Sequence, residues 1–258
     1  MRSLAPRLLV GCAAVIAVLS CGDVPTFADG IAYISAIDLP SIAVGAGDKL
    51  RDSLGDTASL QVRAYDKNNQ LISGVSATYF VSPIDAGIHI DANGFLTASD
   101  SVRTVHVVAR IGDRLQTAVA LLYVVPIPDQ IVGTATTDSL PGAPAKGTLL
   151  VTVTGTRGST QPPTQGIVVR YQIVAVNGST TIDSNRVFLV DDANNPLRNI
   201  RTTAIDTTDP SGIASRFVLV SDTTGIRTIE ISATARSLHG ETIAGNPVKF
   251  LIPLKKGP

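Results

Sequence analysis

The side chains able to do chemistry are few in this chain and stand far apart. Its three histidines are His89, His106 and His239. His89 and His106 stand between apolar neighbours, with no cysteine or acidic residue at metal-ligand spacing near either. His239 belongs to a Leu-His-Gly-Glu turn. The sequence therefore predicts half-exposed structural positions for these histidines and no metal site at them.

Small clusters of Asp and Asn stand in the second half of the chain, where they could bind calcium. Calcium takes about six to eight hard oxygen ligands, often from Asp, Asn and backbone carbonyls on loops. Loops at one end of a β-sandwich could bring such groups together, but the chain has no Asp-x-Asp-x-Asp-Gly spacing. Asp and Asn are also the usual turn residues, so turns are the preferred interpretation and calcium binding is the alternative. The residues concerned are Asp183, Asp191, Asp192, Asn194, Asn195, Asp206 and Asp209.

The motifs of common catalytic sites are missing from the sequence. No Gly-x-Ser-x-Gly motif appears, no His/Asp pair is placed to serve a serine nucleophile, and no Gly-rich phosphate-binding loop exists. The sequence therefore predicts a protein that is not an enzyme and needs no cofactor. Residues 157–165 and 191–201 are the longest irregular stretches and are candidate recognition loops, with solvated connections as the alternative.

Cys21 ends the most informative motif. Residues 13–21 read Ala-Ala-Val-Ile-Ala-Val-Leu-Ser-Cys, and Arg2 and Arg7 precede them. This segment resembles the lipobox of bacterial lipoprotein signal peptides, which implies cleavage before Cys21 and acylation of its sulfur. The apolar run of residues 8–20 is too short to span the roughly 30 Å hydrocarbon core of a bilayer. A cleaved signal is therefore favoured over a transmembrane anchor, and a plain secretory signal is the alternative.

Acylation of Cys21 would determine where the protein works. We expect residues 1–20 to be a signal peptide and residues 21–30 to be the lipidated cysteine and a linker. By resemblance to Gram-negative lipoproteins, Gly22 argues against retention in the inner membrane. The expected location is thus the cell envelope, with the chain anchored in the outer membrane by lipid. The mature chain would keep no second cysteine, so no disulfide is expected.

The rest of the chain shows the pattern of strands. Short runs alternate apolar and polar residues and are bounded by turn residues, whereas long helical periodicity is missing. The Pro126-Ile127-Pro128-Asp129 segment interrupts these runs, because proline cannot donate to a sheet. Sheets with one apolar face must bury it against another sheet. Predicted strands are residues 60–64, 77–81, 88–90, 104–111 and 115–125, then 149–153, 167–176, 187–190, 213–220, 228–235 and 248–254.

Motifs in both halves resemble bacterial immunoglobulin-like domains. Residues 42–45, 60–64 and 90–98 resemble the "I-x-V-G", strand and "V-D-x-x-G-x-V-T-A" elements of the group 2 domain, although Tyr79-Phe80 stands where that family has a Trp. Residues 166–169 and the Thr-Asp-Pro-Ser-Gly-Ile-Ala run at 208–214 resemble the group 1 domain of invasin- and intimin-type proteins. The resemblance implies immunoglobulin-like folds with cell-surface or secreted roles and no catalysis.

Together these features predict an all-β protein of two tandem immunoglobulin-like β-sandwiches, at residues 31–126 and 127–258, after a cleaved lipoprotein signal peptide. The expected function is a membrane-anchored, non-catalytic adhesion or binding module for an unknown protein or glycan. The alternative is a structural or assembly spacer that faces the periplasm. The chain has 21 basic and 21 acidic residues and no basic patch, so nucleic acid is not an expected partner.

Overall fold

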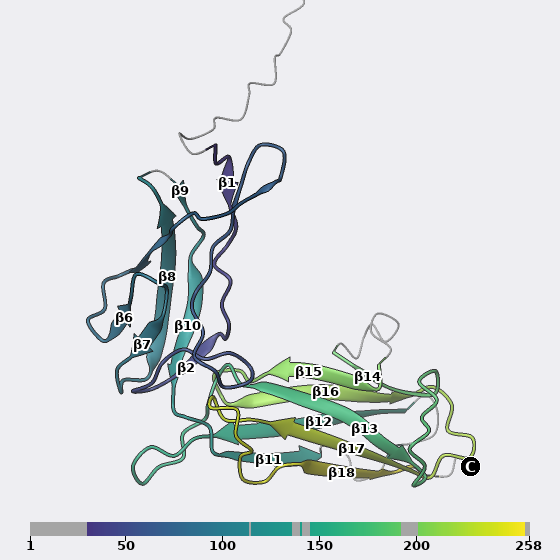
Figure 1. The fold of residues 1–258 in the computed structure, drawn as a ribbon. Coiled ribbons are helices and arrows are strands. Elements are labelled where there is room, and N and C mark those ends of the chain that lie inside the picture. Colours follow the sequence, from purple (N-terminus) through teal and green to yellow (C-terminus); the bar gives the residue numbers. More distant parts are fainter. Residues whose placement is uncertain (1–29, 114, 136–139, 141–144, 192–200, 256–258) are drawn as a thin grey trace, which may run out of the picture.

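The computed structural model describes residues 30–113, 115–135, 140, 145–191 and 201–255. Within these ranges the chain forms strands joined by turns (Figure 1). None of the described residues belongs to a helix able to cross a membrane. The strands build two β-sandwiches, so the predicted all-β fold with two tandem sandwiches is confirmed.

The first sandwich is irregular. Its main sheet has the order β2-β10-β8-β5, with β9 attached to β8, and a three-stranded sheet β1-β3-β4 and the hairpin β6-β7 complete it. Strand β2 pairs with β10 in parallel, whereas the other pairs are antiparallel. The strands are β1 (Tyr33–Ile34), β2 (Ala43–Gly45), β3 (Ala64–Tyr65), β4 (Leu71–Ile72), β5 (Thr78–Val81), β6 (Ile88–Ile90), β7 (Leu96–Ala98), β8 (Arg103–Ile111), β9 (Leu115–Gln116) and β10 (Ala120–Val125).

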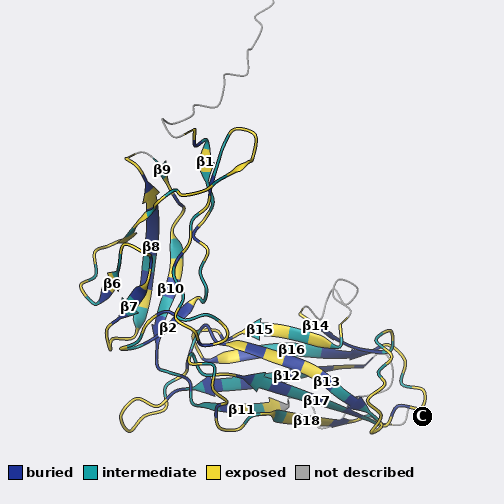
Figure 2. Ribbon diagram, in the orientation of Figure 1, coloured by how far each residue is buried: buried dark blue, intermediate teal, exposed yellow. Residues whose placement is uncertain are grey.

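The second sandwich has two four-stranded sheets, ordered β11-β12-β16-β14 and β15-β13-β17-β18. Every strand pair in it is antiparallel. Burial alternates along its long strands (Figure 2). Because successive side chains of a strand point to opposite faces of the sheet, the buried ones face the opposite sheet. The strands are β11 (Gln130–Ala135), β12 (Ala145–Thr154), β13 (Val168–Val176), β14 (Val187–Val190), β15 (Thr203–Thr207), β16 (Ile213–Val220), β17 (Thr228–Ala235) and β18 (Val248–Pro253).

A single type of hairpin turn recurs in both sandwiches. The first residue is Asp or Ser, and its side-chain oxygen accepts hydrogen bonds from the backbone N–H groups two and four positions later. The fourth residue is Gly or Asn with a positive φ, and its N–H donates to the carbonyl of the first. The five turns begin at Asp52, Asp66, Asp91, Asp209 and Ser237.

The structure corrects several predicted strands. Residues 115–125 are not one strand, because residues 117–119 separate β9 from β10. Within the predicted strand at 60–64, Gln61 forms an isolated bridge with Asp38, and the regular strand begins only at Ala64 (Ala64–Tyr65). The predicted set of strands lacks β1, β2, β4 and β7, which have two or three residues each, and also β11 and β15. In β11 and β15, Gly133 and the Thr-rich sequence weaken the apolar signal. Position 133 in β11 is a glycine because a Cβ there would collide with the side chains of Val248 and Phe250.

Candidate functional site

The junction between the two sandwiches is the most elaborate polar and steric feature of the described chain. Residues 126–129 join β10 to β11, and hydrogen bonds fix the backbone where the chain enters and leaves this connection. On one side, the N–H of Ala46 donates to the carbonyl of Val125 at 2.8 Å. On the other, the N–H of Asp129 donates to the carbonyl of Thr154 at 3.0 Å, and the Asp129 carboxylate accepts from the N–H of Thr156 at 2.9 Å. The connection is therefore held rather than free.

The hydrophobic core of the second sandwich includes residues of the first sandwich. Ala43 and Val125 belong to strands of the first sandwich, yet both pack in the hydrophobic cluster of the second. A Cβ placed on Gly166 would lie 2.9 Å from the Cβ of Ala43, so the backbone that enters β13 contacts β2 directly. Tyr123 also packs against this cluster. The two sandwiches thus share buried surface.

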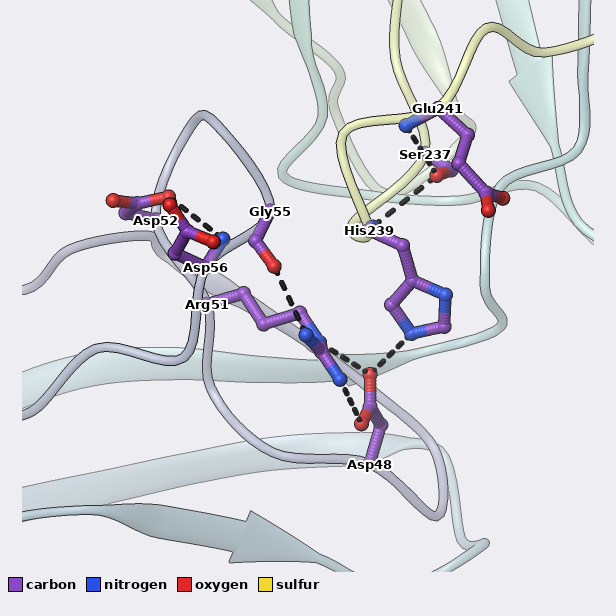
Figure 3. A network of polar contacts seen from close by, with 8 residues as sticks. All are labelled: Asp48, Arg51, Asp52, Gly55, Asp56, Ser237, His239 and Glu241. Atoms are coloured by element: carbon purple, nitrogen blue, oxygen red, sulfur yellow. Dashed lines mark hydrogen bonds and ion pairs between the residues drawn. The ribbon is translucent and has the colours of Figure 1, made fainter.

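A polar network spans the junction beside this apolar contact (Figure 3). The Nε2 atom of His239 lies 2.6 Å from Oδ2 of Asp48. Arg51 donates to both carboxylate oxygens of Asp48, at 3.1 and 3.3 Å, and also to the carbonyl of Gly55 at 2.9 Å. Asp48 and Arg51 come from the first sandwich and His239 from the β17–β18 turn of the second.

Two of the recurring hairpin turns meet at this network. The turn that begins at Asp52 presents Gly55, and the turn that begins at Ser237 presents Gly240. A Cβ on Gly55 would overlap the backbone of His239, and a Cβ on Gly240 would overlap the backbone of Leu54. Both positions therefore need glycine for the close approach of the two backbones, in addition to their positive φ.

Electrostatics at the network favour the charged carboxylate. Burial by itself would raise the pKa of Asp48, but hydrogen bonds from the Arg51 side chain, the Lys49 backbone and His239 outweigh burial and hold that pKa below 3.8. The side chain of Asp48 is only 17% exposed, so these hydrogen bonds are partly shielded from water. Asp48 thus carries a negative charge between two basic side chains.

The chemistry of a serine nucleophile does not fit this arrangement. Ser237 is near His239 in sequence, but its Oγ accepts hydrogen bonds from the backbone N–H groups of His239 and Glu241. The imidazole Nε2 faces Asp48, whereas a catalytic triad directs Nε2 at the serine and the other ring nitrogen at the acid. The contacts join two domains and do not activate a hydroxyl.

A small cleft opens at the same junction. Its volume is about 160 Å³, below the roughly 300–1,000 Å³ of pockets that hold drug-sized ligands. Tyr123 and Arg103 line it from the first sandwich, and Pro163, Gln165 and Pro210 line it from the second. The cleft could take a small group or a side chain of a partner.

The candidate loop at residues 157–165 also lies at the junction. The Arg157 guanidinium donates to the carbonyl of Asp100 in the first sandwich at 2.9 Å, and Pro163 and Gln165 border the cleft. Part of this loop is therefore engaged within the chain. The other candidate loop, residues 191–201, lies largely outside the described residues.

The structure places the three predicted histidines in different settings. His89 is exposed on β6, and His106 is half-buried on β8, as expected for strand positions. His239 lies in a turn with its side chain 35% exposed, as expected, and its hydrogen-bond contact with Asp48 is a feature that the sequence did not predict. Its partner is 191 positions away in the sequence, so no local pattern could reveal the contact.

The acidic residues of the second half serve turns and an ion pair where they are described. Asp209 accepts two backbone hydrogen bonds in its turn, and Asp183 accepts one from the N–H of Asn185. Asp206 pairs with Arg216 at 3.1 Å. Across the described ranges, His, Cys, Asp and Glu side chains form no group of three or more suited to a metal ion. Asp192, Asn194, Asn195 and the predicted lipidation site Cys21 lie outside the described residues.

No protein-family model and no curated protein match the chain. Among solved structures, it is similar to the adhesin InvE of Yersinia pseudotuberculosis, with 17% identity, a TM-score of 0.39, and coverage of 89% of this chain and 61% of that one. The D0-D1 domain of intimin has 15% identity, a TM-score of 0.28, and coverage of 86% and 98%. Domains 4 and 5 of the S-layer protein SbsC have 14% identity, a TM-score of 0.31, and coverage of 86% and 98%. The chain thus spans about three fifths of the InvE structure.

Proposed function

We propose that this chain is an extracytoplasmic lipoprotein, anchored in a membrane by acyl chains on Cys21. Its two sandwiches act as a non-catalytic adhesion or binding module for a protein or a glycan. The signal-like segment at residues 1–20 and the lipobox-like residues before Cys21 support the anchor. Stable anchoring by lipid takes two or more acyl chains or a second membrane contact.

The interlocked junction is the observation that carries the binding function. The Asp48–His239 pair, the meeting of Gly55 with Gly240, and the shared apolar surface hold the two sandwiches in one bent unit. A rigid support lowers the entropy cost of placing contact loops before a partner. The junction cleft, at about 160 Å³, is small for a substrate. The Asp48, Arg51 and His239 side chains of the junction contact one another, which supports a joining role rather than catalysis.

The alternative role is a structural or assembly spacer that faces the periplasm. The same bent, rigid unit supports this role, because a spacer must keep a constant length and angle. The two roles differ in where the sandwiches stand. A binding module for external ligands needs them outside the cell, and a periplasmic spacer needs them inside.

Protease digestion of intact cells separates the two roles. Loss of this protein, while a known periplasmic protein survives, would support the external binding module. Protection until the outer membrane is broken would support the periplasmic spacer. Replacement Cys21→Ser tests the anchor in the same cells. We expect the variant in the soluble fraction with unchanged unfolding, and a variant that stays with the membrane would contradict the anchor.

A further inference from the structure

An exposed apolar row crosses the small sheet at one end of the first sandwich. Tyr33 on β1 pairs with Tyr65 on β3, and Tyr65 pairs with Leu71 on β4, so the three side chains share one face. The opposite face carries Ile34, Ala64 and Ile72, which pack in a small hydrophobic cluster. Alternation along the strands therefore turns the Tyr33–Tyr65–Leu71 row away from the core.

The row combines two exposed apolar side chains with a stacked pair of aromatic rings. Tyr33 is 43% exposed and Leu71 is 58% exposed. The rings of Tyr33 and Tyr65 stack with centroids 5.0 Å apart, and the Tyr33 hydroxyl donates to Oδ1 of Asn69 at 2.9 Å. The two rings thus form a fixed amphipathic plate with Leu71 beside it. Such plates suit the boundary between lipid and water, where an apolar ring body and a polar hydroxyl are both satisfied.

The place of this row in the chain indicates what it meets. Strand β1 lies at the end of the first sandwich that is far from the second, and the described chain begins beside it at Gly30 (Figure 1). Tyr33 follows Cys21 by twelve positions. An extended chain of that length reaches at most about 40 Å, at roughly 3.3–3.6 Å per residue. An anchor at Cys21 would therefore keep the row at high effective concentration near the bilayer.

The charged side chains nearest the row are of both signs. The Asp66 carboxylate accepts hydrogen bonds from the N–H groups of Asn68 and Gln70 within its turn. Lys67 is exposed on that same turn and offers a positive charge to anionic lipid. Arg63, two positions before Tyr65, forms an ion pair with Asp38 at 3.5 Å, so the charges of these two side chains offset each other.

We propose that the Tyr33–Tyr65–Leu71 row rests on the bilayer that holds the acylated Cys21. The inference depends on the proposed lipid anchor and adds a second membrane contact to it. The second sandwich joins the end of the first that is far from the row (Figure 1), so the row and the acylated Cys21 would hold the first sandwich to the bilayer at two points. The anchored protein would then stand with a defined orientation instead of swinging on its linker.

A tryptophan reporter tests this contact, because the natural chain has no Trp. Leu71→Trp places the reporter in the row, and Leu251→Trp is the matched control on β18 of the second sandwich, where Leu251 is 70% exposed. Each full-length protein is purified from membranes with its acyl chains. It is then reconstituted in vesicles of phosphatidylethanolamine and phosphatidylglycerol with and without brominated lipid. Tyr33→Trp is a second reporter, in case Leu71→Trp does not fold.

We expect blue-shifted emission and quenching by brominated lipid at position 71 and water-like emission at position 251. Unquenched emission at positions 71 and 33 in an acylated protein would overturn the contact and leave the anchor standing. Mass spectra that show no acyl chains on Cys21 would instead overturn the anchor, and the inference with it. Equal quenching at positions 71 and 251 would also overturn the proposed contact. So would a blue shift of the emission at position 71 that appears at high protein concentration in the absence of vesicles.

Discussion

Gly55 and Gly240 come from different sandwiches and meet backbone to backbone. Each is the fourth residue of the same type of turn, and a side chain on either would overlap the opposite turn. The turn chemistry that closes hairpins inside each sandwich therefore also shapes the surface by which the sandwiches join. Beside this contact, Asp48 and His239 add a polar contact across the same boundary.

Replacing Gly55 with alanine should loosen the junction. The added Cβ collides with the His239 backbone, so we expect a loss of about 1–3 kcal/mol in the free energy of unfolding from this overlap. Gly74→Ala is the matched control, because Gly74 has a similar positive φ and no atom near its Cβ. The control should lose only the cost of placing a residue with a Cβ at positive φ, which is about 1–2 kcal/mol in the free energy of unfolding. Urea unfolding and small-angle X-ray scattering measure both effects, and equal losses with unchanged scattering would count against the steric role of Gly55.

Asp48→Asn should weaken the link between the sandwiches at neutral pH. It removes the charge that accepts from Arg51 and faces His239, at an expected cost of about 1–3 kcal/mol. The control is Asp38→Asn, since Asp38 is 61% exposed in its pair with Arg63 and should contribute about 0–1 kcal/mol. Chemical denaturation of both variants gives the comparison. Equal effects would mean that the Asp48 network adds no more than a surface ion pair.

Acidic pH should remove the stabilisation that the Asp48 carboxylate gives to the folded protein. Its pKa in the folded protein is lowered, so its stabilising effect is complete above the ordinary value of 3.8 and disappears as the pH falls through the folded value. The gap in unfolding free energy between the natural protein and Asp48→Asn should therefore narrow below about pH 4. Urea midpoints across this range test it. A gap that widens on acidification would have the wrong sign for a lowered pKa.

Gly94→Val should destabilise the first sandwich strongly. Gly94 has a φ of +81°, and its Cβ would lie 2.7 Å from the Leu60 carbonyl oxygen, which also accepts the Tyr79 hydroxyl. Backbone strain and overlap together should cost about 2–4 kcal/mol. Gly112→Val has a positive φ but open space around its Cβ, so it isolates the backbone term. Thermal unfolding measures both, and similar melting temperatures for the two variants would refute the steric part.

Tyr171→Phe should remove a hydrogen bond that joins the two sheets of the second sandwich. The fully buried hydroxyl on β13 donates to the Ala214 carbonyl on β16 at 2.8 Å, a contact worth about 0.5–1.5 kcal/mol. Burial raises the pKa of Tyr171 above 10.0, so the natural protein should lose stability as the pH rises past that value. The Tyr171→Phe variant should not show the part of this loss of stability at high pH that Tyr171 causes. Unfolding between about pH 8 and pH 11 tests this, and identical slopes would contradict it.

Strand β13 and the turn at Asp91 show why much of the fold was predictable. The alternation of buried and exposed residues in β13 has period 2, and Asp91 with Gly94 makes its own turn hydrogen bonds. Each of these two patterns is contained in a stretch of a few consecutive residues. Strand β15 was missed because its TAIDT sequence has little apolar content and its pairing with β13 comes from across the sheet.

The sequence by itself determined the class of fold, the turn chemistry and the lack of familiar catalytic motifs, because these depend on neighbours along the chain. Tertiary structure alone decided that Asp48 meets His239 across 191 positions, that Gly55 meets Gly240, and that Tyr33, Tyr65 and Leu71 share an exposed face. Contacts of this kind arise when the packing of whole sheets brings distant turns together. Their energies depend on that packing, and no local spacing encodes it.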